Sequence, residues 1–179
     1  MAATLPAITD ELAEWMHAQP VFFVATAPRD GHVNLSPKGY DTLRVLDEHR
    51  VAYLDLTGSG VETIAHLREN GRITVMFCAF SGNPRICRLH GEGVVHEIGT
   101  SEFDALAQHF ELLPGSRSII EIAVSRVSTS CGYSIPLMDL VDDRDRLHEW
   151  ARAKGEEGLV DYWASKNAVS IDGLPALGS

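Results

Sequence analysis

The sequence has only three cysteines, few basic residues and no apolar run long enough to cross a membrane, which would take about 20 residues. The odd number of cysteines (Cys78, Cys87 and Cys131), without a signal-peptide pattern, predicts reduced thiols in a cytoplasmic protein. Fifteen lysines and arginines stand against 25 aspartates and glutamates, a net charge of −10 over 179 residues. This charge argues against nucleic acid or an anionic membrane as a partner.

Several catalytic and binding signatures are also missing. No G-x-G-x-x-G follows a predicted strand, which leaves little support for a Rossmann fold. Gly58-Ser59-Gly60 lacks the G-x-S-x-G spacing of a serine nucleophile. The spacing of Cys78, Cys87 and His90 matches no common zinc pattern, so we expect buried thiols and no metal site.

Apolar periodicity predicts an α+β fold with six or seven antiparallel strands in meander order and helices between them. Such a sheet avoids exposed edges by closing into a barrel. The strand at 73–80 is nearly all apolar, which predicts burial on both faces. The other strands are expected at 21–26, 33–36, 42–46, 50–56, 85–96 and 119–127. Helices are expected at 10–19, 61–70, 101–113, 145–154 and 159–163.

The segment 55–63 is the most informative for function. A strand ends, small residues follow, and Ser59 with Glu62 has the spacing of a capping box that opens a helix. The free N–H groups and positive dipole of such a helix start suit a phosphate, to which Thr57, Ser59 and Thr63 add hydroxyl donors. An ordinary capped helix is an equally good interpretation of this segment alone.

A second candidate segment is Asn34-Leu35-Ser36-Pro37-Lys38-Gly39. Pro37 predicts an irregular strand, and Gly39 permits close approach of the backbone to a ligand. Lys38 offers a cation beside a phosphate. Taken alone, a β-bulge with Lys38 in solvent is the favoured alternative.

The third candidate segment is Pro84-Arg85-Ile86-Cys87-Arg88-Leu89-His90-Gly91. Arg85 and Arg88 are three positions apart, so in a regular strand they face opposite ways. One of them could reach a ligand while the other pairs with an acidic neighbour. For a lone arginine on a strand, a surface ion pair is the commoner role.

The order and spacing of these segments resemble the pyridoxamine 5′-phosphate oxidase superfamily of FMN-binding split β-barrels. The likeness extends over about 21–127, and 130–136 resembles a segment of one branch of that superfamily. The resemblance implies an antiparallel split barrel forming one domain over 1–179. Its core would occupy about 21–127, and a helical C-terminal extension would occupy 139–179. It also implies a homodimer with FMN in clefts between the subunits.

Carried over by position, the resemblance assigns roles to individual residues. The stretch from Ser36 through Pro37 and Lys38 to Gly39 would line the ring and ribityl chain, and Asp55, Leu56 and Thr57 would present backbone groups to the ring. Ser59 and Thr63 would hold the phosphate, while Arg85 and Arg88 would reach toward the flavin. Cys131 and Tyr133 are candidates for substrate contact, and no catalytic acid or base is evident.

The chain also departs from the family pattern. Glu62-Thr63 stands where the vitamin B6 oxidases carry an Arg-Lys pair, and their C-terminal basic residues have no match, so oxidation of pyridoxamine phosphate is not expected. The expected function is an FMN-dependent oxidoreductase acting on a small molecule, with NADH or NADPH as candidate reductant. A non-catalytic flavin-binding or sensing protein is the alternative. A deazaflavin or haem binder is a further one, for which His32 or His90 would be the haem feature.

Overall fold

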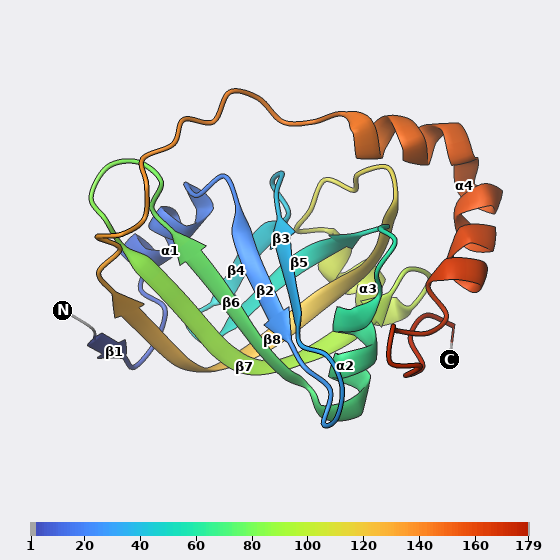
Figure 1. Ribbon diagram of the computed structural model, residues 1–179, viewed down its shortest axis with the longest axis horizontal. Coiled ribbons are helices and arrows are strands. Elements are labelled where there is room, and N and C mark those ends of the chain that lie inside the picture. Colours follow the sequence, from blue (N-terminus) through green and yellow to red (C-terminus); the bar gives the residue numbers. More distant parts are fainter. Residues whose placement is uncertain (1–2, 179) are drawn as a thin grey trace.

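The computed structural model describes residues 3–178, which form one antiparallel sheet and four helices (Figure 1). The strands are β1 (Ala3–Leu5), β2 (Phe22–Thr26), β3 (Asn34–Lys38), β4 (Leu43–Asp47), β5 (Arg50–Leu56), β6 (Arg72–Cys78), β7 (Ile86–Glu97) and β8 (Ser116–Ser130). The helices are α1 (Asp10–His17), α2 (Glu62–Asn70), α3 (Ser101–Ala107) and α4 (Arg146–Lys166). The α+β class is confirmed, and none of the described helices is long and apolar enough to cross a membrane.

The strand order is β3-β2-β6-β7-β8-β5-β4, with β1 paired to β8. The predicted meander is therefore wrong, because β2 pairs with β6 and β5 pairs with β8, far apart in sequence. The helix α2 packs on β2 and β7. It connects β5 to β6, which then pairs with the edge of β2. The path is open, with β3 and β4 at its ends, as in a split barrel.

The core lies on both sides of β5. Val51 and Tyr53 belong to the larger apolar cluster, whereas Ala52 and Leu54 belong to a smaller cluster beneath α3. The expectation for β6 is wrong in part, because its buried residues alternate with half-buried ones such as Thr74. Only one face of β6 is covered by the chain itself.

Three helix ends can be explained from local chemistry. The Thr9 hydroxyl caps α1, and Gly71 ends α2 in the left-handed region at φ 72°. The prediction of a helix over 101–113 is too long: after Ala107 the chain tightens into three-residue turns, in which Phe110 N donates to the Ala107 carbonyl. The two helices predicted near the C-terminus are the two halves of α4, which breaks at Gly155.

Candidate functional site

A cavity of about 270 Å³ opens where β3, the end of β5, the loop 58–60, the start of α2 and one residue of β8 meet. Its lining consists of Asn34, Ser36, Pro37, Lys38, Asp55, Leu56, Gly58, Ser59, Gly60, Glu62, Thr63 and Arg117. In β3 the half-buried Asn34, Ser36 and Lys38 alternate with the exposed Leu35 and Pro37, and Pro37 still borders the cavity. Three segments far apart in sequence thus build one polar pocket.

The floor of the cavity is an ionic network around Asp55, whose side chain is 1% exposed. Its Oδ1 accepts a hydrogen bond from Lys38 Nζ at 3.0 Å, and its Oδ2 accepts one from Arg117 Nε at 2.7 Å. Burial alone would raise the pKa of Asp55, but the charges of Arg117 and Lys38 outweigh it and lower that pKa to about 2. Asp55 therefore stays ionised at neutral pH, and the network carries one net positive charge.

The network leaves donors free at the cavity. Lys38 has three N–H groups and gives one of them to Asp55. The Lys38 side chain is 20% exposed, so its remaining donors are accessible. Lys38 thus lies neither in solvent nor on a bulge: β3 pairs regularly with β2 through Pro37, opposite Phe23. The predicted irregularity at Pro37 is wrong because an edge strand needs no N–H on its outer side.

The loop 58–60 is held by its carbonyl groups. Arg117 Nη2 donates to the Gly60 carbonyl at 3.0 Å, and Asn167 Nδ2 donates to the Gly58 carbonyl at 3.1 Å. Among residues 3–178, the N–H groups of Gly58, Ser59 and Gly60 donate no hydrogen bond. All three residues line the cavity, so their N–H groups are available to a ligand.

The capping box predicted for α2 does not form. Val61 is the N-cap residue, and no side chain caps this helix. The Glu62 carboxylate instead lies against Gly60, and its Oε1 accepts a hydrogen bond from the Ile171 N–H at 3.3 Å. Ser59 is exposed and its hydroxyl has no partner within the described chain, so both it and the first N–H groups of α2 are left for a ligand.

A second polar network orders the wall formed by β3 and α2. The Asn34 amide donates to Thr63 Oγ1 at 3.1 Å and to Thr26 Oγ1 at 3.4 Å, and it accepts from Ser36 Oγ at 3.1 Å. Thr26 Oγ1 lies 2.9 Å from His66 Nδ1. Burial lowers the pKa of His66, which keeps the imidazole neutral at pH 7. The orientation of Asn34 is therefore fixed before any ligand binds.

Seven of the residues predicted to bind cofactor line this cavity: Ser36, Pro37, Lys38, Asp55, Leu56, Ser59 and Thr63. Gly39 lies beyond the end of β3. Thr57 is buried, and its hydroxyl donates to the Gly115 carbonyl at 2.7 Å.

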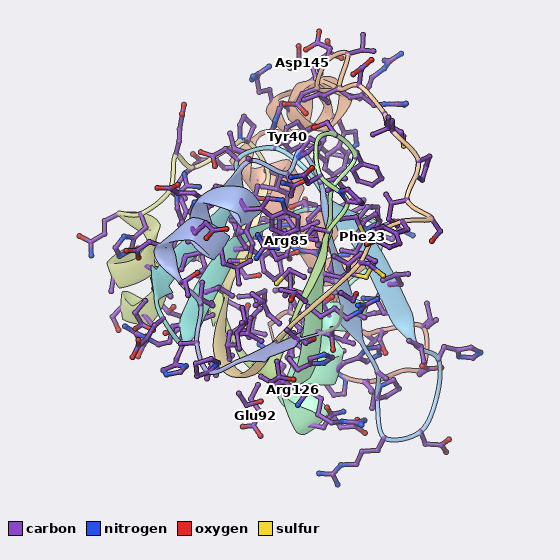
Figure 2. All side chains as sticks on the ribbon, turned by 90° about the vertical axis from the view of Figure 1, so that its left-hand side faces the viewer. Phe23, Tyr40, Arg85, Glu92, Arg126 and Asp145 are labelled. Carbon is purple, nitrogen blue, oxygen red and sulfur yellow. The ribbon has the colours of Figure 1, made fainter. Side chains whose placement is uncertain are left out.

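The two predicted arginines lie elsewhere. Arg85 stacks on the Trp15 ring at 5.0 Å and faces Glu11, and Arg88 donates to Ser130 Oγ at 3.3 Å. Figure 2 shows Arg85 near the middle of the molecule, below Tyr40 and above Glu92. Neither arginine lines the cavity of its own chain.

The cysteines divide into two kinds. Cys78 and Cys87 are buried as expected, and burial raises the pKa of the Cys87 thiol to about 11. Cys131 is exposed, and Tyr133 is 81% exposed in the connector that follows β8. The two substrate candidates thus stand on an exposed segment outside the cavity lining.

Neither histidine named for the haem alternative lines the cavity. His32 pairs with Asp172 at 2.7 Å, and this hydrogen bond raises the pKa of His32. His90 Nδ1 lies 3.1 Å from Thr74 Oγ1 on the neighbouring strand.

Two residues that hold the cavity, Arg117 and Asn167, were not predicted from the sequence. Arg117 stands between two serines at the start of β8, directly before the predicted strand at 119–127, and a charge at that position was an available signal. Asn167 lies at the C-terminal end of α4 and has no signal in its neighbourhood.

A larger and more open hollow of about 730 Å³ lies against β2, β6, β7 and β8. Its arginines are engaged elsewhere: Arg50 pairs with Asp47 and Glu121, and Arg72 bonds Asn70. The smaller cavity is therefore the better candidate for recognising a charged ligand.

A family model and a known relative match this chain, and both belong to the same family. The family model described as "Pyridoxamine 5'-phosphate oxidase" matches residues 8–131. The pyridoxamine 5'-phosphate oxidase family protein ustO of Aspergillus flavus is 42% identical over 190 residues, covering 96% of this chain and 76% of that protein.

Two solved structures share the fold. HupZ from Group A Streptococcus gives a TM-score of 0.53 at 24% identity, covering 67% of this chain and 91% of that one. The FAD binding protein from Mycobacterium smegmatis gives a TM-score of 0.50 at 13% identity, covering 69% and 96%.

Proposed function

Because the chain belongs to the pyridoxamine 5′-phosphate oxidase family, we propose that it binds FMN at the 270 Å³ cavity and acts as an FMN-dependent oxidoreductase on a small molecule. Flavin binding on this fold is supported by the FAD binding protein of the same architecture. The substrate class is set by the cofactor, which exchanges a hydride with a small organic molecule.

One observation carries the assignment of the cofactor. The accessible cation of Lys38, held by the buried Asp55, lies beside the free N–H groups of 58–60 and the start of α2. This combination suits a phosphate, for which Lys38, Ser59, Thr63 and the N–H groups of 58–60 would supply charge and hydrogen bonds. Ser36 and Pro37 would lie along the rest of the cofactor.

The chain's own residues would bind and orient the cofactor, with no evident acid or base. Asp55 has a pKa of about 2 and is held by two cations, so it has no proton to donate at neutral pH. Glu62 is the other carboxylate of the lining and already accepts a backbone hydrogen bond. Proton transfer in the proposed reaction would therefore use the substrate or solvent.

We also propose that the site is completed by a second copy of the chain. The cavity is smaller than the 300–1,000 Å³ typical of small-molecule sites, so it takes only part of a cofactor. Beside it, Val33, which precedes the edge strand β3, and Leu35 of that strand are 75% and 63% exposed. An edge strand with an apolar outer face is suited to being covered by a partner.

Light scattering and FMN titration test the dimer together. Val33→Lys with Leu35→Lys should reduce the molar mass from dimer to monomer and weaken FMN binding. Val94→Lys, at a 56% exposed valine of β7, is the matched control and should leave both unchanged. A wild-type monomer that binds FMN normally would contradict the dimer but not the cavity assignment.

The phosphate assignment is tested by comparing FMN with riboflavin, which lacks the phosphate. Lys38→Met should weaken FMN binding roughly 10- to 160-fold, the effect of losing a charge-assisted contact of about 1.5–3 kcal/mol, and should leave riboflavin binding unchanged. Arg126→Met removes an exposed cation of β8 that bonds Thr4 and should change neither. Equal FMN affinity in wild type and Lys38→Met would refute the assignment.

Catalysis is tested on the FMN-loaded protein without oxygen. If the protein is an oxidoreductase, NADH or NADPH should bleach the flavin absorption, and an added electron acceptor should restore it. A flavin that dithionite reduces but neither nicotinamide does would favour the non-catalytic flavin-binding alternative.

A further inference from the structure

The C-terminal arm, defined as residues 163–172, returns to the candidate site from outside the region matched by the family model. It comprises the last turn of α4 and the segment after it, and Figure 1 shows this part of the chain ending beside α2. Trp163 Nε1 donates to Thr57 Oγ1 at 2.8 Å, and Asp172 bonds His32. Hydrogen bonds thus hold both ends of the arm to the rest of the protein, and Asn167 lies between these contacts.

Asn167 is fully buried, and both the oxygen and the nitrogen of its side-chain amide make hydrogen bonds. Its Oδ1 accepts from Arg117 Nη1 at 2.9 Å, and its Nδ2 donates to the carbonyls of Gly58 at 3.1 Å and Ser59 at 3.5 Å. Arg117 also donates to the Gly60 carbonyl. Three successive carbonyls of the loop therefore point toward the Asn167–Arg117 pair.

Because the peptide unit is planar, the direction of each of these carbonyls also sets the direction of the N–H group that follows it. In a trans peptide the C=O of one residue and the N–H of the next point in opposite directions, and the described residues contain no cis peptide bond. Holding the carbonyls of Gly58, Ser59 and Gly60 on one side directs the N–H groups of Ser59, Gly60 and Val61 to the other. No side chain caps α2, and the N–H groups of Ser59, Gly60 and Val61 donate no hydrogen bond within the described chain.

We propose that Asn167 is a positioning residue for the phosphate end of the cofactor. It orients the N–H groups of 59–61 without touching the ligand, and Arg117 supports it while also holding Asp55. This inference rests on the proposed FMN site, but it also stands for any phosphate bound at this loop. It assigns to the C-terminal arm a role in binding as well as packing.

The first test uses two substitutions of Asn167 and two ligands. Asn167→Ala removes both contacts, whereas Asn167→Asp keeps an acceptor for Arg117 and loses the donor to the Gly58 carbonyl. Both should weaken FMN binding at least tenfold and leave riboflavin binding within twofold. Equal losses for FMN and riboflavin, or none for either, would show a purely structural role and overturn the proposal.

Asn70→Ala is the matched control. Asn70 is a half-buried asparagine at the other end of α2 whose amide also donates to a loop carbonyl, that of Ala27 at 2.9 Å. It should lower thermal stability as an asparagine-to-alanine change does, without selective loss of FMN. A control that reproduces the FMN-specific loss would overturn the proposal.

A second test needs no flavin and separates this inference from the proposed function. Inorganic phosphate is titrated into ¹⁵N-labelled apo protein, and the amide signals of Ser59, Gly60 and Val61 should shift in wild type and in Asn70→Ala but not in Asn167→Ala. That result supports the inference even if FMN does not bind. Absence of these shifts in wild type, or their persistence in Asn167→Ala, would overturn it.

Discussion

Replacing the buried carboxylate of Asp55 by an amide should destabilise the protein substantially. Asn keeps the shape of the side chain but leaves Lys38 and Arg117 without their counter-charge. Removing one partner of a buried ion pair typically costs about 3–5 kcal/mol. With the Lys38 side chain 20% exposed, part of that cost is relieved by solvent, and we expect a loss toward the lower end.

The pH dependence of stability gives a second value for the free energy that the Asp55 carboxylate contributes to folding. Its pKa is about 2 in the folded protein and 3.8 ordinarily, so its stabilising effect is fully present above the ordinary value and lost as the pH falls through 2. A depression of this size corresponds to about 2 kcal/mol. The two figures bracket the expected loss, which for a chain of this length lowers the Tm by roughly 4–20 °C.

Urea denaturation of the flavin-free protein at pH 7 and at pH 3 measures the effect. Asp55→Asn should lower the free energy of unfolding by about 2–5 kcal/mol at pH 7. The gap to wild type should narrow at pH 3, because the Asp55 carboxylate of the unfolded wild type is then mostly protonated while that of the folded protein is still mostly ionised. Asp47→Asn breaks an exposed pair with Arg50 that solvent screens, so it should lower the free energy of unfolding far less than Asp55→Asn does. A gap below 1 kcal/mol for Asp55→Asn, or one equally large at both pH values, would refute the reasoning.

Three other substitutions give sharp expectations. Glu62→Gln removes a negative charge beside the proposed phosphate and should tighten FMN roughly two- to fivefold in a binding titration, the size of a partly exposed charge interaction; weaker binding would show that this carboxylate helps. Gly91→Ala would place a Cβ 2.1 Å from the Ala123 carbonyl oxygen, and we expect a loss of about 3 kcal/mol or more in urea denaturation, whereas a wild-type midpoint would contradict the close approach. Trp163→Phe keeps an aromatic side chain but loses part of the indole ring and its bond to Thr57, so the unfolding free energy should fall by at least about 0.5–1.5 kcal/mol, the value of the hydrogen bond alone. No change would mean that water replaces the donor.

Local pattern predicted most of the strands because alternation and turn residues are properties of neighbouring positions. The hairpin of β2 and β3, the cap at Thr9 and the helix end at Gly71 all follow from such signals. The order of the strands could not be predicted in this way. The pairing of β2 with β6 depends on where α2 packs, which is decided by burial between residues distant in sequence.

The candidate site shows the same division. Lys38 and Ser59 stand in segments with recognisable patterns, and the structure places both at the cavity. The contact of Arg117 with Asp55 depends on the strand register that sets Asp55 opposite Ser118. The contact of Asn167 with the loop 58–60 depends on how a segment more than a hundred residues later in the chain packs against that loop. The capping-box prediction for Ser59 failed because α2 begins at Glu62 with Val61 as its N-cap, so Glu62 is the first helical residue and not the third. The Glu62 carboxylate accepts a hydrogen bond from the Ile171 N–H instead.

The net charge of −10 opposes an anionic ligand only weakly at this site. At physiological ionic strength, exposed charges are screened over about 8 Å, whereas partly buried ones are screened much less. The local balance is set by Lys38 and Arg117 against Asp55 and Glu62, which cancel in formal charge. Recognition of a phosphate must therefore come from directed N–H and O–H donors rather than from excess positive charge. This is why the orientation of the loop 58–60, and the asparagine that fixes it, should matter more to affinity than the total charge of the chain.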